Sequence, residues 1–342
     1  MTRRRPPRGH RWRSAWVVAM LLVLLGPAHP AQAYLKFGIA LSGRSVTLRW
    51  KTVPVRYRVS EQTVTGVTAL EFRDAVGRAF ATWEAVPTAA IRYEFGGFTD
   101  LRPFEDDGQS VLGFASRPEL DRVLASTSLL IDEVTGELIE SDIFFNTAFP
   151  WSVAPGGDAR GFDLETIALH EIGHFSGLGH SALGETDIVD TGRRVTSAEA
   201  VMFPIAFSPG STANRSLKAD DVAGISDLYP ELAFTASTGS VSGRVTLNGA
   251  GIFGAHVVAF NPKTGALVGG FTLNQQGQFS IAGLSPGVHL LRVEPLDDVD
   301  IGSFFDELLP VSLDFRVGVH PRLVSVPRGG DSGSTDVRVT PK

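Results

Sequence analysis

Three histidines and one glutamate stand close together in residues 170–180, which read HEIGHFSGLGH. His170 and His174 are four residues apart, so on a helix both imidazoles project from the same face, one turn apart. This spacing lets both rings reach one Zn²⁺ at ~2.0–2.1 Å. Gly177 tolerates the left-handed conformation that ends a helix, and the chain can then turn back and present His180. The pattern predicts a zinc ion held by His170, His174 and His180.

Three protein ligands leave a fourth position for water, which is typical of a catalytic zinc site. Glu171 points away from the histidine face, where it can take a proton from zinc-bound water and deliver one to a leaving amine. Zinc lowers the pKa of that water toward ~7 and polarises the substrate carbonyl. Between Tyr34 and Gly239 the sequence has only these three histidines. Because its carboxylate can take up and release this proton, Glu171 is the expected general base.

The extended pattern H-E-x-x-H-x-x-G-x-x-H resembles that of the metzincin zinc metalloproteases. Metzincins also have a Met-turn downstream, and residues 200–204, AVMFP, look like one. The resemblance implies that Met202 forms an apolar floor beneath the zinc. An ordinary core methionine is the alternative.

Within the metzincins the sequence is most similar to the matrixins. Ser181 follows the third histidine, as is typical of that family, and residues 217–229 look like the closing helix of the matrixin catalytic domain. The resemblance implies that Asp220 and Asp221 tie this helix to the active-site region. The alternative is that both are first-turn acids favoured by the helix dipole.

Several features depart from the matrixin pattern. The sequence has no cysteine, so the thiolate with which a matrixin pro-segment blocks the zinc has no counterpart. An insertion, Ala182 to Val195, lengthens the gap before Met202, and we expect it to line or cover the cleft. Family analogy makes Ca²⁺ a second candidate metal, although none of the acidic loops fits the EF-hand spacing. The candidate oxygen ligands are Asp100 to Asp107, the region of Asp158, and Glu185, Asp187 and Asp190.

The elements that would position these residues have readable sequence signals. Thr68 and Glu71 form a capping box that opens a helix with an apolar stripe, and Asp163 is a suitable N-cap for the helix of the histidines. Strands are expected at 54–59 and 91–95, and a hairpin at 128–145 turns at Thr135-Gly136. A last helix covers 220–228. We therefore predict an α+β metzincin-like catalytic domain over 34–234, with a twisted mixed sheet and three helices.

The first 33 residues resemble a secretory signal peptide. They combine six arginines, an apolar run from Ala15 to Leu25, and Ala31-Gln32-Ala33 as a cleavage site before Tyr34. The run is too short for a membrane anchor, which needs about 20 apolar residues. Cleavage would leave 25 basic against 37 acidic residues. An acidic mature protein, secreted or periplasmic, makes nucleic acid a poor partner.

The sequence changes character near residue 235. Residues 235–239 are small and polar and predict a linker, and short β-type runs separated by Gly, Pro and Asn follow over 240–342. Residues 240–295 resemble the carboxypeptidase-regulatory-like, transthyretin-like β-sandwich. We expect an all-β sandwich with a stabilising or adhesive role, contacting a surface or matrix, in which His256, His289 and His320 are ordinary strand residues.

These observations predict a secreted zinc endopeptidase acting on proteins or peptides. An extended substrate would add as a strand beside an exposed sheet edge, which the hairpin at 126–145 can supply. The alternative is a secreted binding or surface-adhesion protein whose metzincin domain is inactive. Glu171 favours the enzyme, because a purely structural metal site has no use for that carboxylate.

Overall fold

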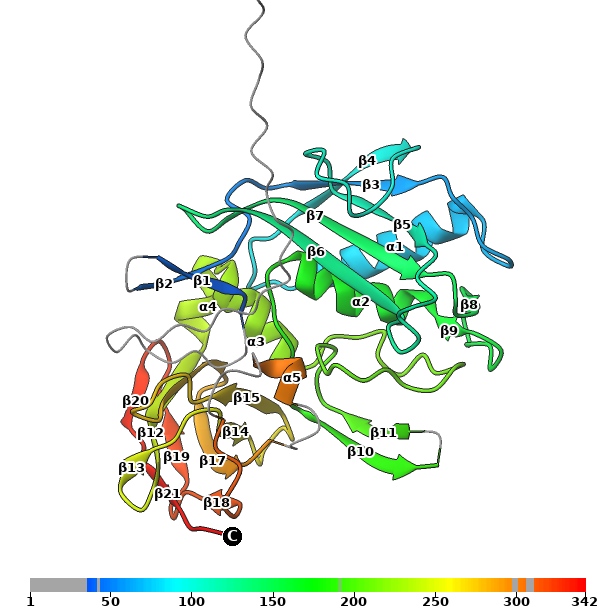
Figure 1. Ribbon diagram of the computed structural model, residues 1–342. Coiled ribbons are helices and arrows are strands. Elements are labelled where there is room, and N and C mark those ends of the chain that lie inside the picture. The colour runs from blue at the N-terminus through cyan, green and yellow to red at the C-terminus, as the bar shows by residue number, and fades with distance from the viewer. Residues whose placement is uncertain (1–35, 42–43, 191, 297–300, 306–310) are drawn as a thin grey trace, which may run out of the picture.

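A computed structural model describes residues 36–41, 44–190, 192–296, 301–305 and 311–342 of the chain. The predicted signal peptide, 1–33, lies outside these residues. In this part of the chain, a layer of helices under a mixed sheet occupies the N-terminal two thirds, and strands make up most of the remainder (Figure 1). None of its helices is long and apolar enough to cross a lipid bilayer.

The main sheet confirms the prediction of a mixed sheet in an α+β domain. Its strand order is β4-β3-β5-β7-β6, with β6 antiparallel to β7 and the other pairs parallel. The hairpin expected at Thr135-Gly136 joins β6 to β7, which leaves β6 at an edge of the sheet. The bounds are β3 Val55–Ser60, β4 Tyr93–Thr99, β5 Val111–Ala115, β6 Ala125–Asp132 and β7 Glu137–Asn146.

Two helices, α1 (Ala69–Glu84) and α2 (Leu164–Phe175), lie together under this sheet (Figure 1). The capping box of α1 is formed as expected, with the Thr68 hydroxyl accepting from the Glu71 N–H and the Glu71 carboxylate accepting from the Thr68 N–H. The buried side of α1 carries Phe72, Val76, Phe80 and Trp83. The Trp83 indole donates to the carbonyl of Leu169 at 2.8 Å, which ties α1 to α2.

Smaller elements surround this core. Two hairpins pair β1 (Gly38–Leu41) with β2 (Arg44–Thr47) and β10 (Gly184–Val189) with β11 (Gly192–Ala198), and β8 (Trp151–Ser152) pairs with β9 (Phe162–Asp163). The insertion expected to line or cover a cleft thus forms most of the β10–β11 hairpin, which projects from the rest of the fold in Figure 1. Ile188 of β10 is exposed to solvent.

The predicted closing helix is α3 (Ala219–Leu228), and a fourth, short helix follows it. This helix, α4 (Leu232–Ser237), occupies most of the segment expected to be a linker, and β12 begins directly afterwards at Gly239. Phe234 of α4 is buried. The sequence did not predict this helix because its small polar residues have a weak helix preference, which the burial of Phe234 outweighs.

The C-terminal region is rich in strands, as predicted, and they form two sheets. In one, β12 (Gly239–Leu247) pairs with β13 (Ala250–Gly251), β16 (Gln278–Leu284), β20 (Asp331–Ser334) and β21 (Val337–Val339). In the other, the order is β15 (Leu267–Phe271), β14 (His256–Phe260), β17 (Gly287–Glu294) and β18 (Gly318–Val319), with β19 (Val324–Val326) also on β17. Buried apolar side chains from both sheets belong to one cluster. The short helix α5 (Ile301–Phe304) follows β17.

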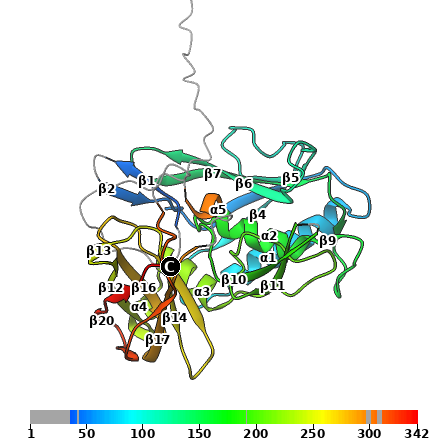
Figure 2. The same cartoon turned by 60° about the horizontal axis from the view of Figure 1, so that its bottom comes forward.

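The two regions share a continuous apolar core. Ile225 and Leu228 of α3 belong to the same buried cluster as Val241 and Ile281 of the C-terminal sheets. Figure 2 shows α3 between helices α1 and α2 of the N-terminal region and the strands β12, β14 and β16. One close approach is at Gly283 of β16, where a Cβ atom would lie 2.6 Å from the Cβ of Ala223.

This approach predicts that Gly283→Ala destabilises the protein more than a glycine substitution at similar φ in open space. Gly283 has φ +76°, and Gly249, with φ +86°, has no neighbour near its Cβ position. Positive φ costs each alanine roughly 1–2 kcal/mol, and overpacking adds about 1–3 kcal/mol at Gly283 alone. Urea unfolding of both variants measures the difference. Equal losses would mean that α3 and β16 are not tightly packed.

Candidate metal centre

Helix α2 carries His170, Glu171 and His174, and its start is fixed by Asp163. The Asp163 carboxylate accepts from the Thr166 N–H at 2.9 Å, as the N-cap prediction required. The Arg215 guanidinium also holds this carboxylate, with Nε at 2.9 Å from Oδ2. The buried cap and its cation define where the helix begins and therefore which face the histidines occupy.

The turn after α2 brings His180 back toward the helix. Gly177 has φ +100°, its N–H donates to the His174 carbonyl at 2.8 Å, and the next N–H, of Leu178, donates to the Gly173 carbonyl at 3.0 Å. These are the two hydrogen bonds of a Schellman motif. A Cβ at Gly177 would also lie 2.7 Å from the Leu48 carbonyl oxygen. Glycine is required here both for the backbone conformation and for the close approach.

Each of the three histidines donates a hydrogen bond from Nδ1 to a backbone carbonyl. The acceptors are Val201 for His170 at 2.8 Å, Leu178 for His174 at 2.8 Å and Ser303 for His180 at 2.6 Å. A carbonyl oxygen only accepts, so the proton of each ring is on Nδ1. Burial lowers the pKa of all three rings, to about 3 for His170, which favours their neutral forms. Every Nε2 is left with a free lone pair.

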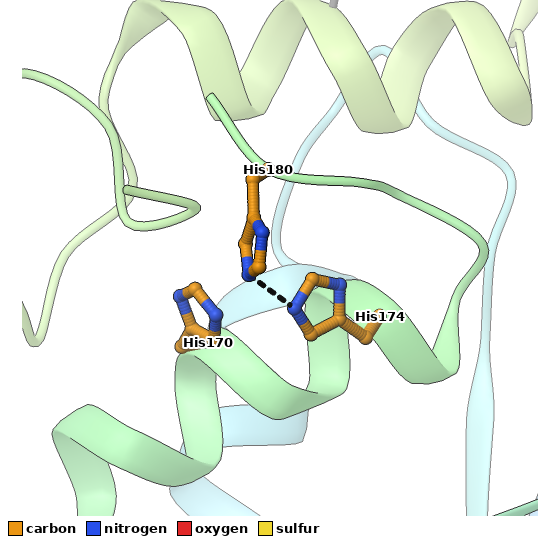
Figure 3. A group of neighbouring side chains, drawn as sticks. All are labelled: His170, His174 and His180. Atoms are coloured by element: carbon orange, nitrogen blue, oxygen red, sulfur yellow. Dashed lines mark hydrogen bonds between the residues drawn. The ribbon is translucent and has the colours of Figure 1, made fainter. Parts of the chain in front are cut away.

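The three rings point toward one another (Figure 3). One ring nitrogen of each lies within 4.8 Å of the others, and the Nε2 atoms of His174 and His180 are 3.1 Å apart. The contact drawn between these atoms in Figure 3 joins two unprotonated nitrogens, and a cation between them would give each lone pair a partner. Two nitrogens bound to one tetrahedral Zn²⁺ at ~2.0–2.1 Å would lie about 3.4 Å apart. This donor set fits zinc.

Met202 lies beneath the histidine helix and is buried, in contact with Gly173. A Cβ at Gly173 would meet the Met202 sulfur at 2.2 Å, so the methionine packs where a side chain on α2 would otherwise stand. The Met202 carbonyl accepts from the Ser181 N–H at 2.9 Å. Sequence reasoning singled out Met202 but missed Gly173. Its place inside the helical histidine motif, where glycine is unfavourable, was the available signal.

Glu171 faces the edge strand of the sheet. Its side chain is only 6% exposed, and Thr127 of β6 donates to its Oε2 at 2.6 Å. Burial raises the pKa of Glu171 to about 7, while the Thr127 hydroxyl acts in the opposite direction. A carboxyl with this pKa can both accept and release a proton near neutrality. Thr127 could not be found from sequence, because it is 44 residues from Glu171.

The two aspartates at the start of α3 have different partners. Asp221 accepts from the backbone N–H groups of Val201, Met202 and Lys218 at 2.9, 3.2 and 2.8 Å. Asp220 accepts from the Gly269 N–H of β15 at 2.8 Å and from the Ser181 hydroxyl. Burial raises the pKa of both carboxyls. Of the two alternatives left by the sequence, these contacts favour a tie between α3 and the residues around the histidines.

The acidic candidates for calcium have different surroundings, and the charges of Asp106 and Asp107 act on the buried carboxyl of Glu140. Asp187 pairs with Arg194 and Asp158 with Arg160, so each already has a cationic partner. Among the described residues, the three histidines are the group whose ligand atoms converge. In the C-terminal region His256 pairs with Glu294, whereas His289 and His320 contact nearby backbone carbonyls.

An α+β domain with three convergent histidines on and after one helix defines a protein with a candidate metal site. Residues 49–230 match the profile of the Matrixin family, which is more than half of the chain, and the chain belongs to this family.

Its relatives include matrix metalloproteinase-20 of Homo sapiens, 30% identical over 184 residues that make up 53% of this chain and 32% of the relative. Metalloendoproteinase 1 of Glycine max is 29% identical over 170 residues, 46% of this chain and 45% of the relative. Stromelysin-2 of Rattus norvegicus is 26% identical over 193 residues, 53% of this chain and 33% of the relative. The chain thus spans about a third to a half of the length of these curated relatives.

The three hydrogen bonds to Asp221 predict a large loss of stability in Asp221→Ala. The substitution leaves three backbone N–H groups without their acceptor, at about 1–3 kcal/mol each when buried, so we expect at least ~3 kcal/mol. Asp187→Ala makes the same substitution in an exposed ion pair and should lower the free energy of unfolding by less than ~1 kcal/mol. Denaturant unfolding compares the two. A loss for Asp221→Ala no larger than for Asp187→Ala would contradict the anchoring role.

Proposed function

We propose that this chain is an exported zinc-dependent metalloendopeptidase that hydrolyses peptide bonds in proteins. Members of the Matrixin family are zinc metalloendopeptidases, which gives the reaction class. The observation that carries the proposal for this chain is the convergence of three imidazoles on and after α2, the helix that also holds the buried carboxyl of Glu171. His170, His174 and His180 would hold one Zn²⁺ through Nε2.

The residues around the histidines have separable roles. Zinc, when bound, is a Lewis acid that polarises the scissile carbonyl and acidifies water. Glu171 takes up a proton as the nucleophile forms and returns it to the leaving nitrogen. Thr127 orients the Glu171 carboxylate through its hydroxyl hydrogen bond. Met202 packs against Gly173 beneath α2 and so sets how closely the helix approaches the residues below it.

The edge of the main sheet is the proposed substrate surface. β6 pairs with β7 on one side only, and its Thr127 contacts Glu171. An extended peptide laid along β6 would gain main-chain hydrogen bonds and would pass beside the Glu171 carboxyl. This supports a preference for extended, unfolded segments of protein substrates.

The C-terminal region is proposed to be a carboxypeptidase-regulatory-like β-sandwich. Its two sheets and their shared buried cluster support this proposal. A contact with a surface or matrix and a bound Ca²⁺ remain expectations from the sequence. Export would follow from the signal peptide at 1–33, with cleavage after Ala33.

Activity should depend on Glu171 and on zinc. With casein as substrate, Glu171→Ala should lower kcat/KM by about 10²–10⁴-fold, because no other group replaces the proton transfer. Glu199→Ala, which removes an exposed glutamate, is the matched control and should be fully active. Equal cleavage by wild type, Glu171→Ala and chelator-treated protein would exclude the enzyme and favour the secreted binding protein with an inactive domain.

Metal analysis provides the complementary measurement. The mature protein should contain about one zinc per chain, and His174→Ala should lose it because a tetrahedral site with two remaining protein ligands binds weakly. His320→Ala removes a histidine of the C-terminal region and should keep the metal. Zinc retained by His174→Ala would contradict the assignment of the ligands.

Export predicts a defined N-terminus. The mass of the protein recovered outside the cytoplasm should correspond to a chain that begins at Tyr34, because Ala31-Gln32-Ala33 provides the small residues that signal peptidase requires. Intact-protein mass spectrometry measures it. An exported chain that retains residues 1–33 would contradict cleavage at this site.

A further inference from the structure

A helix of the C-terminal region, α5, lies beside the histidine cluster. In Figure 1 it lies between α2 and the C-terminal strands, and in Figure 2 it is again next to α2 and β6. The Ser303 carbonyl of α5 accepts the Nδ1–H of His180 at 2.6 Å, and the Phe304 ring stands edge-on to the His180 ring, with centroids 6.3 Å apart. Ser303 is 123 residues from His180 in sequence, and folding brings it into contact with this proposed ligand.

We propose that the C-terminal region completes the metal centre: the Ser303 carbonyl positions His180 for zinc, and Phe304 holds that carbonyl in place. The inference rests on the proposed zinc site. It assigns to the C-terminal region a positioning role inside the catalytic unit, in addition to any stabilising or adhesive role.

His180 depends on such a partner more than the other two histidines do. His170 and His174 are on α2, so the helix fixes where their side chains leave the backbone. His180 follows the helix in chain without regular structure. A hydrogen bond from Nδ1 fixes both the rotation of its ring and the tautomer that leaves Nε2 free for a metal. Without the Ser303 carbonyl, the buried Nδ1–H would lose its acceptor and the ring could turn or change tautomer.

The position of Ser303 is itself determined by packing within the C-terminal region. The neighbouring Phe304 and Phe305 are 2% and 1% exposed. The Phe305 ring lies 5.2 Å from that of Phe253 and 5.4 Å from that of Phe271, and Phe304 lies 5.7 Å from Phe271. Phe271 belongs to β15, so the sheet of the C-terminal region is the support on which α5 rests. Two buried aromatic side chains make this a firm attachment.

The segment that follows His180 contacts the same sheet from another side. The Ser181 hydroxyl and the Gly269 N–H of β15 both donate to Asp220. Leu183 belongs to a buried cluster with Ala200 and with Val258 of β14. The chain around His180 is therefore attached to the C-terminal sheet through Asp220, through Leu183 and through the Ser303 carbonyl.

The test is the zinc affinity of full-length protein in which α5 has lost its anchor. Phe304→Ala removes the ring that holds Ser303 near His180, and zinc should bind about 10–100-fold more weakly, the usual effect of losing a hydrogen-bond partner of a ligand. Phe304→Leu keeps an apolar anchor and should recover most of the affinity. Val339→Ala, which truncates a buried residue of β21 away from α5, is the matched control for a weakened C-terminal region. Competition with a chelating dye gives the dissociation constants, and thermal unfolding of the metal-free proteins verifies that each is folded.

A measurement on wild-type protein needs no variant. With ¹⁵N-labelled histidine and no metal, the Nδ1–H proton of His180 should be observed far downfield and exchange slowly, as expected for a buried proton on a carbonyl. Absence of this signal would overturn the proposal even if Phe304→Ala failed to fold.

The outcomes separate this inference from the proposed function. Weaker zinc binding in Phe304→Ala but not in Val339→Ala supports the positioning role. Wild-type zinc affinity in every variant overturns the positioning role but leaves the proposed zinc enzyme in place. Faster casein cleavage by Phe304→Ala at unchanged zinc affinity also overturns it, because α5 would then be a cover over the site. A wild-type protein that binds no zinc overturns the proposed function and this inference together.

Discussion

The interaction on which the rest of the structure depends is the hydrogen bond from each histidine Nδ1 to a backbone carbonyl. It selects the tautomer with a free Nε2 and fixes the rotation of each ring. The acceptors come from the turn after α2, from the residue before Met202, and from α5 of the C-terminal region. The backbone before Met202 and helix α5 must therefore both reach α2 and its turn, although they are 31 and 123 residues from the histidines that they contact.

Helix α3 links the residues around the histidines to the C-terminal region through its first turn. Asp221 gathers the backbone around Met202, while Asp220 links Ser181 to β15. Both carboxyls are buried, so their hydrogen bonds replace hydration that folding removed, and loss of either acceptor leaves buried donors unpaired. Because the apolar core is continuous across α3, the N-terminal region and the C-terminal sheets are parts of one packed structure.

Much of the fold could be predicted from sequence because its signals are local. The capping box at Thr68, the N-cap at Asp163, the turn at Thr135-Gly136 and the left-handed Gly177 each act within a few residues, and each is present. The prediction was incomplete where burial decides. α4 (Leu232–Ser237) overlaps the segment 235–239 that was expected to be a linker, and Phe234, the residue before that segment, is buried. The insertion after His180 forms most of the β10–β11 hairpin, which no local sequence pattern indicated.

The sequence by itself determined the kind of chemistry, because the i, i+4 spacing of His170 and His174 and the turn at Gly177 fix how three imidazoles can approach one another. Only the tertiary structure decided which groups hold those imidazoles and tune Glu171. Thr127 is 44 residues from its partner, Ser303 is 123 residues from His180, and Asp220 meets Gly269 across 49 residues. The physical reason is that spacing along the chain fixes directions within one element, whereas hydrogen-bond partners and burial arise only where separate elements pack.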